Sequence, residues 1–346
     1  MSSAEIINYL TLFLGIIVFF TFNLFNFRFA KYFNLIDNPK KNKIHKNATP
    51  LTASYSIFFV FIIYHLLYLT FQDFNYDILL IFFSGIFGFS IGILDDKKNL
   101  GYNIKFLVFI IFILIIINFS ENLILNVIYF ETFNKFFYLT NLEANLVTIL
   151  CILLLINATN LCDGINGLCL GVLTIWLFYI NFKFSSDLDL STIIILSIFS
   201  FLYIIRGFYF LGNSGSHFLG IFIGAVIIYT YNLKINNISQ AEIMSVEEIF
   251  ILLMLPGIDM LRLFIIRILN KKNPFSSDLS HLHHYLIKRY NLIISLFVYF
   301  ISIITPLVLY NFTNIEPFII IIGFVFFYIF LINYLVKKTN NNIIDL

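Results

Sequence analysis

Residues 144–168 read ANLVTILCILLLINATNLCDGINGL and join a long apolar run to a dense polar cluster. After the apolar run come Asn157, Asn160, Asp163 and Asn166, interspersed with two glycines. Amide and carboxylate side chains are costly near hydrocarbon, so in a membrane protein they usually mark a functional site. The stretch therefore predicts a membrane-spanning helix that ends at a functional site.

The composition of the whole chain supports a membrane protein. Of its 346 residues 60% are hydrophobic and only 12% are charged, and the mean hydropathy is +0.94. This excludes a soluble globular protein, and apolar runs of about 20 residues fit helices that cross a bilayer. The first run, residues 6–27, has no basic segment before it and no small-residue cleavage site. We expect it to be a retained span, not a signal peptide.

We predict one all-α integral membrane domain over residues 1–346, with about 11 transmembrane helices and short loops. The predicted spans are 6–27, 51–70, 78–94, 105–119, 144–161, 164–182, 190–206, 216–231, 247–268, 291–310 and 317–336.

The distribution of basic residues predicts the orientation. With the N-terminus outside and the C-terminus cytoplasmic, every lysine and arginine except Lys135, Lys183 and Lys234 lies on the cytoplasmic side. Basic residues in short loops favour the cytoplasm, so this orientation is preferred. Alternate spans then begin at the cytoplasmic face, and a helix N-terminus favours bound phosphate. We expect a phosphorylated substrate at that face.

Five polar clusters fall at the predicted cytoplasmic face. They are Lys43–His45 with Pro50, Asp95–Lys105, Asn157–Leu168, Gly212–Ser216 and Asp259–His284.

The adjacent carboxylates Asp95 and Asp96 predict a cation site. An isolated pair of this kind is more often a solvated turn. Here the pair ends an apolar span and meets a lysine-rich loop. Paired hard oxygens suit Mg²⁺, which binds through one or two carboxylates together with substrate phosphates.

The asparagine-rich stretch and the glycine-rich stretch also have simple structural explanations. Helix capping would explain one or two of the asparagines, but three of them at spacings of three and six exceed what a cap requires. Asn157 and Asn160 share one helical face, because residues three apart are neighbours. Residues 212–216 fit a turn before a serine-capped helix as well as they fit an anion site.

The three histidines His281, His283 and His284 suit phosphate contact or acid–base work. A polar cytoplasmic loop is the simplest alternative. A zinc site is disfavoured because no cysteine or further histidine lies in this loop and the chain has no CxxC pair. We expect His65 to be structural, and His217 belongs to no pattern.

Taken in this order, the five clusters resemble the motifs of the polyprenyl-phosphate N-acetylhexosamine-1-phosphate transferase family, glycosyltransferase family 4. The resemblance covers roughly residues 37–290 and is strongest to the undecaprenyl-phosphate N-acetylglucosaminyl-1-phosphate transferase-like branch. It implies transfer of sugar-1-phosphate from a UDP-N-acetylhexosamine, by default UDP-GlcNAc, to a polyprenyl phosphate, with release of UMP. This would be the first membrane step of a cell-surface glycan such as O-antigen or teichoic acid.

The resemblance also implies the cofactor, the partners and the roles of individual residues. The cofactor would be Mg²⁺, with Mn²⁺ as the alternative. The protein would act in a bacterial plasma membrane with its site facing the cytoplasm and without nucleic acid; a homodimer is one open option. By similarity, the catalytic residues are Asp95, Asp96, Asp163 and His281, the metal-binding residues are Asn160, Asn213 and Asp96, and the substrate-binding residues are Lys43, His45, Lys105, Asn157, Asn166, Ser216, Arg262, His283 and His284.

Two departures from the family pattern matter, and one further residue bears on the branch. Asn213 stands where the family usually has aspartate, which predicts weaker metal binding and leaves open an inactive homologue. Ala53 and Ser54 replace a usual pair of glycines. Asn99 stands where the muramoyl-pentapeptide branch usually has lysine, so that branch is disfavoured.

The implied chemistry depends on positioning and electrostatics. A phosphate monoester has a second pKa near 6, so the lipid phosphate is already largely a dianion at neutral pH. We therefore expect Asp95 and Asp96 to position metal and acceptor more than to remove a proton. The main rival is a transporter or lipid flippase, but transporters usually place polar residues near the bilayer midplane. The sugar, the downstream polymer and the prenyl length stay open.

Overall fold

The computed structural model describes residues 3–39, 47–183, 188–236, 243–274 and 279–344. These residues form two compact units. Unit 1 contains residues 1–123 and 151–230, and unit 2 contains residues 124–150 and 231–346. The predicted site residues Lys43 and His45 lie outside the described residues.

The elements of unit 1 are nearly all helical. They are α1 (Ser3–Tyr32), β1 (Ile36–Asp37), β2 (Thr49–Pro50), α2 (Ala53–Phe71), α3 (Tyr76–Lys98), α4 (Tyr102–Phe119), the 3₁₀ turn η1 (Glu121–Leu123), the second half of α5 (Asn141–Cys162), α6 (Leu168–Lys183), α7 (Ser191–Ile205) and most of α8 (Gly212–Asn236).

Unit 2 combines a β-hairpin with helices. Its elements are β3 (Val127–Phe130), β4 (Lys135–Tyr138), the first half of α5, the end of α8, α9 (Val246–Leu269), α10 (Leu282–Arg289), α11 (Leu292–Phe312) and α12 (Pro317–Ile344).

The prediction of an all-α multi-pass membrane protein is confirmed at this level. Nine helices of the described chain are long and apolar enough to cross a membrane, and α6 and α7 are apolar but shorter, with 16 and 15 residues. Each predicted span coincides with one of these helices. The number of true spans and the sidedness remain predictions.

A small sheet joins two connections of unit 1. In an antiparallel pair, Ile36 of β1 lies opposite Pro50 of β2. Leu51, directly after β2, forms a parallel bridge with Phe210, and the Phe210 N–H donates to the Pro50 carbonyl at 2.8 Å. The chain that follows Phe210 starts α8, so this bridge fixes where that helix begins.

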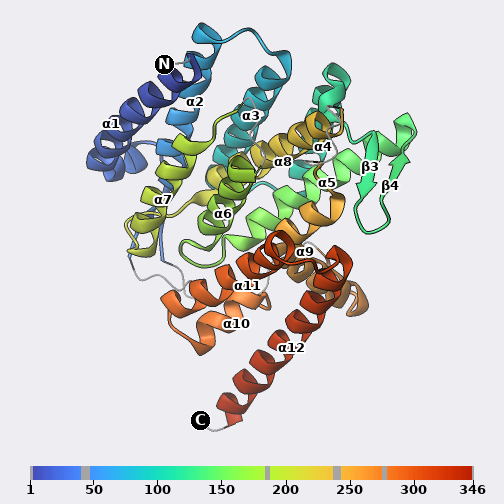
Figure 1. The fold of residues 1–346 in the computed structure, drawn as a ribbon. Coiled ribbons are helices and arrows are strands. Elements are labelled where there is room, and N and C mark those ends of the chain that lie inside the picture. Colours follow the sequence, from blue (N-terminus) through green and yellow to red (C-terminus); the bar gives the residue numbers. More distant parts are fainter. Residues whose placement is uncertain (1–2, 40–46, 184–187, 237–242, 275–278, 345–346) are drawn as a thin grey trace. The chain divides into compact units, whose positions relative to one another are not determined.

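Helix α8 is the central element of unit 1 (Figure 1). Every residue from 214 to 230 is buried. The Ser214 hydroxyl lies 3.0 Å from the Ser54 hydroxyl of α2, and the Phe218 ring packs edge-on against Phe61. A helix that is apolar on all sides is expected to be enclosed by other helices.

Glycines let α3 approach α8 closely. A Cβ added at Gly92 would lie 2.3 Å from the Ser214 Cα atom and 2.4 Å from the Asn213 carbonyl oxygen. These are backbone atoms of the first turn of α8, so no side-chain rotation would relieve the clash. The glycine is therefore needed for the position of that turn.

We expect Gly92→Ala to lower the free energy of unfolding by about 1–3 kcal/mol, the usual cost of overpacking. The measurement is the thermal unfolding midpoint of the detergent-solubilised protein. Gly323→Ala in α12 is the matched control, because an added Cβ there meets nothing within 4 Å. Equal midpoints for the two variants would contradict the close α3–α8 contact.

The hairpin of unit 2 is held against the start of α9. Val127 pairs with Tyr138 and Phe130 with Lys135 in an antiparallel register. At the turn, the Glu247 carboxylate accepts the N–H groups of Glu131 and Thr132, both at 3.1 Å. The turn backbone is thereby hydrogen-bonded to α9.

Candidate active site

Asp95 joins the end of α3 to the start of α4. Asn99 adopts a left-handed conformation, with φ +49°, and reverses the chain. One oxygen of the Asp95 carboxylate accepts the Leu100 N–H at 2.8 Å, and the other accepts the Lys105 ammonium at 2.8 Å. Asp95 is 2% exposed. A buried carboxylate requires such partners. The ion pair with Asp95 also fixes the position of the Lys105 side chain near the start of α4.

His217 is a member of this group that the sequence did not indicate. Its Nε2 atom lies 3.5 Å from the same Asp95 oxygen that binds Lys105. The ring is buried and packs edge-on against Phe109 of α4. The only available signal was its position one helical turn after Asn213.

Asp96 is bound to the start of α8. Its two oxygens accept the N–H groups of Asn213 at 2.8 Å and Ser214 at 3.0 Å. Gly212 precedes them with φ +76°, and a Cβ there would lie 2.9 Å from the Asp96 carboxylate. Asp96 is therefore an N-terminal cap supplied by another helix. Because it takes these two N–H groups, substrate phosphate must rely on other donors.

Two asparagines face each other beside Asp96. The Asn160 amide nitrogen donates to the Asn213 side-chain oxygen at 2.9 Å and to the Ser216 hydroxyl at 3.2 Å. The neighbouring Thr159 hydroxyl bonds the Ser216 carbonyl at 3.2 Å. The end of α5 is thus tied to the start of α8, at the residue whose backbone N–H binds Asp96.

Asp163 lies one residue beyond α5 and reaches solvent. Part of its hydration is lost in the folded chain, and the charge of Asp96 lies nearby. Loss of hydration first, and Asp96 second, raise the pKa of Asp163 to about 7. Asn166 follows in the turn before α6. Asn157 lies in α5, one helical turn before Asn160.

The oxygen atoms around Asp96 suit a cation such as Mg²⁺. They comprise a carboxylate and amide oxygens, which are hard ligands. Within the described residues, no three or more His, Cys, Asp or Glu side chains are grouped to hold a metal ion. A cation here would therefore be completed by substrate phosphates and water, which is the usual arrangement for Mg²⁺.

The predicted histidine cluster forms a second polar group, within unit 2. Asp259 of α9 accepts His281 Nδ1 at 2.8 Å and the Arg262 guanidinium at 3.1 Å. A polar loop was the simplest alternative for these residues, but His281 is the N-terminal cap residue of α10, and His283 and His284 lie in its first turn. All three imidazoles are buried. Burial lowers the pKa of His283 well below its usual value, so this ring is neutral at pH 7.

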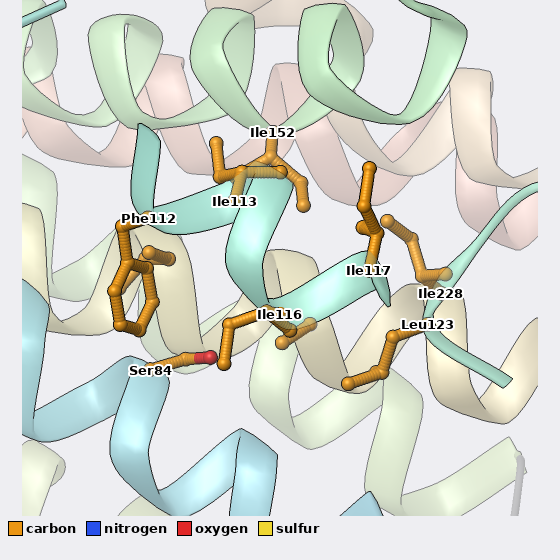
Figure 2. Close-up of a pocket in the computed structure, with 10 residues that line it drawn as sticks. Ser84, Phe112, Ile113, Ile116, Ile117, Leu123, Ile152 and Ile228 are labelled. Carbon is orange, nitrogen blue, oxygen red and sulfur yellow. The ribbon is translucent and has the colours of Figure 1, made fainter. Parts of the chain in front are cut away.

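An apolar cavity lies within unit 1, along the helices that carry the first polar group. Figure 2 shows its lining by Ile113, Ile116 and Ile117 of α4, with Ile152 of α5 and Ile228 of α8. Its one polar lining side chain, the Ser84 hydroxyl, donates within its own helix to the Leu80 carbonyl. The cavity lining is therefore apolar and offers no group that could take part in chemistry.

The structure thus gathers the predicted residues into two groups, each within one unit. Unit 1 brings together Asp95, Asp96, Lys105, Asn160, Asp163, Asn213 and Ser216, and unit 2 brings together Arg262, His281, His283 and His284.

Comparison with known proteins confirms the predicted resemblance. Residues 78–231 match the family model of glycosyl transferase family 4. An undecaprenyl-phosphate alpha-N-acetylglucosaminyl 1-phosphate transferase of Thermotoga maritima is 27% identical over 259 residues, which cover 74% of each chain. A probable undecaprenyl-phosphate N-acetylglucosaminyl 1-phosphate transferase of Bacillus subtilis is 28% identical over 274 residues, 74% of this chain and 71% of the relative.

Proposed function

We propose that this chain, which matches the model of glycosyl transferase family 4 over residues 78–231, transfers N-acetylhexosamine-1-phosphate from a UDP-sugar to a polyprenyl phosphate and releases UMP. UDP-GlcNAc and undecaprenyl phosphate are the proposed substrates, in keeping with the names of the two relatives. The observation that carries the proposal is the meeting of Asp96, Asn160 and Asn213 beside the Asp95–Lys105 pair.

In the proposed reaction, an oxygen of the lipid phosphate attacks the β-phosphorus of the UDP-sugar. The new bond joins this oxygen to phosphorus, and the bond to the UMP oxygen breaks. Negative charge develops on the phosphoryl oxygens, so fixed positive groups stabilise the transition state. Lys105 has three ammonium hydrogens and gives one to Asp95. The other two suit the diphosphate of the donor.

Asp95 and Asp96 fit positioning roles better than proton removal. Asp95 holds Lys105, and Asp96 holds the first turn of α8. The acceptor phosphate needs no strong base, because its second pKa lies near 6. Mg²⁺, if bound by Asp96, Asn160 and Asn213, would neutralise charge on the donor diphosphate.

The helices that carry the polar group are otherwise apolar, as a lipid acceptor requires. The apolar cavity is lined by branched aliphatic side chains of α4, α5 and α8, and these helices also carry Lys105, Asn160 and Asn213. A lipid phosphate at the polar group would thus be bound by helices whose other side chains are apolar. We place this reaction at the cytoplasmic face of a bacterial inner membrane, in line with the distribution of basic residues.

The test is UMP release by the purified full chain in detergent, with undecaprenyl phosphate, Mg²⁺ and a panel of UDP-N-acetylhexosamines. Release that requires both metal and lipid, with one sugar preferred, is the expected result. Absence of UMP with every sugar from both the natural chain and Asn213→Asp would contradict the proposal and favour a transporter.

The same assay tests the role of Asn213. Its side-chain oxygen faces Asn160 and contributes no charge to a cation. We expect Asn213→Asp to lower the Mg²⁺ concentration for half-maximal UMP release by about tenfold, because ligand charge tunes affinity. Asn157→Asp, one turn earlier on α5, is the matched control for an added carboxylate. An equal shift in both variants would show a general charge effect instead of a ligand.

A further inference from the structure

The buried carboxylate of Asp259 is enclosed by donors from three helices of unit 2. It is 3% exposed. One oxygen accepts the Tyr328 hydroxyl of α12 at 2.6 Å, the Arg262 guanidinium at 3.1 Å and the Leu282 N–H at 3.1 Å. The other oxygen accepts His281 Nδ1 at 2.8 Å. A buried charge persists only when its lone pairs are satisfied in this way.

The hydroxyl of Tyr328 is the middle of a hydrogen-bonded chain. It accepts from Arg262 Nε at 2.7 Å and donates to Asp259 at 2.6 Å. Arg262 is fixed in turn by the Ser280 carbonyl, at 2.5 Å. The guanidinium and the hydroxyl therefore set the orientation of the carboxylate from one side, and the carboxylate is fixed relative to α10.

The orientation of the carboxylate determines which nitrogen of His281 carries a proton. A carboxylate only accepts hydrogen bonds, so the imidazole must hold its proton on Nδ1. The other nitrogen, Nε2, is buried and has no hydrogen-bond partner among the described residues. The His281 ring is further held by the parallel ring of His283, at 5.4 Å between centroids and 9° between planes. Nε2 thus carries a lone pair that no group of the described residues uses.

We propose that Tyr328 is a positioning residue of the transferase: through Asp259 it holds His281 as the Nδ1-protonated form, with the Nε2 lone pair unused. The inference rests on the proposed function and adds a residue from the last helix, outside the segment that matches the family. At metal sites, removal of a partner that orients an imidazole through its second nitrogen typically costs 10- to 100-fold in affinity or activity, which sets the scale expected here.

The variant Tyr328→Phe tests this role. It removes one hydroxyl, so Arg262 Nε loses its acceptor and Asp259 loses a donor. We expect kcat for UMP release to fall about tenfold. Tyr334→Phe is the matched control, because it removes a hydroxyl from the same helix without touching Asp259. It should leave kcat within about twofold.

A second measurement separates positioning from a general loss of folded protein. Side-chain ¹⁵N NMR of the histidine-labelled full chain in detergent, without substrate, reports which nitrogen is protonated. The chain has six histidines, and His281→Asn identifies the signal of His281. We expect Nδ1–H alone in the natural chain and a mixture of forms in Tyr328→Phe.

The outcomes distinguish this inference from the proposed function. Failure of the natural chain to release UMP contradicts the proposed function, whereas the NMR signal is read without turnover. An Nε2-protonated His281 in the natural chain would overturn the inference even if Tyr328→Phe did not fold. So would a Tyr328→Phe protein with unchanged kcat and an unchanged His281 signal.

Discussion

Replacing Asp96 with alanine is expected to reduce UMP release at least about 1,000-fold, which corresponds to about 4 kcal/mol in the activation barrier. The carboxylate has two roles. In the proposed site it is the charged ligand of the cation, beside Asn160 and Asn213, and it accepts two N–H groups at the start of α8. Alanine removes the ligand and leaves the first turn of α8 without its cap.

The second role predicts a measurable loss of stability. Removal of an N-terminal cap costs about 0.5–2 kcal/mol, so the thermal unfolding midpoint of Asp96→Ala should fall. Asp189→Ala is the control, because Asp189 accepts the Ser191 N–H at the start of α7 in the same unit. It should lose similar stability and keep its UMP release. Full turnover by Asp96→Ala would refute the assignment of the site.

The helices of this protein were predictable because apolar runs of this length have few other solutions in a membrane. The pairing of Asp96 with α8 was not predictable in the same way. The sequence placed Asp96 and residues 212–216 on one side of the membrane, and a phosphate-binding helix start was the simplest interpretation. Only the backbone of Gly212 and the closeness of Gly92 bring the carboxylate itself to that helix.

The roles of two further residues, Tyr328 and His217, could not be predicted from the sequence. Tyr328 is one of 20 tyrosines and sits in an apolar helix, so no local pattern separates it from a lipid-facing residue. His217 likewise looked like a lone histidine. Both became visible because they contact a carboxylate that was already suspected, Asp259 in one case and Asp95 in the other. Long-range contacts of this kind depend on helix packing, which composition does not encode.

Replacement of Lys105 is expected to cause the second large loss of UMP release. Lys105→Ala should lower kcat by about 10²- to 10³-fold, the usual loss when one donor to a developing phosphoryl charge is removed. It should also destabilise the fold, because Asp95 then remains buried without its cation. The Lys105 side chain is 22% exposed, so the cost should lie between about 1 kcal/mol for a surface pair and about 3–5 kcal/mol for a buried one.

The double variant Asp95→Asn/Lys105→Ala separates these two effects. An asparagine can still accept the Leu100 N–H and carries no charge, so the uncompensated buried carboxylate is gone. We expect the unfolding midpoint to recover towards that of the natural chain while UMP release stays low, because no cation faces the diphosphate. Recovery of both properties would mean that Lys105 serves only to neutralise Asp95. In that case the positive charge for the transition state must come from elsewhere in the protein.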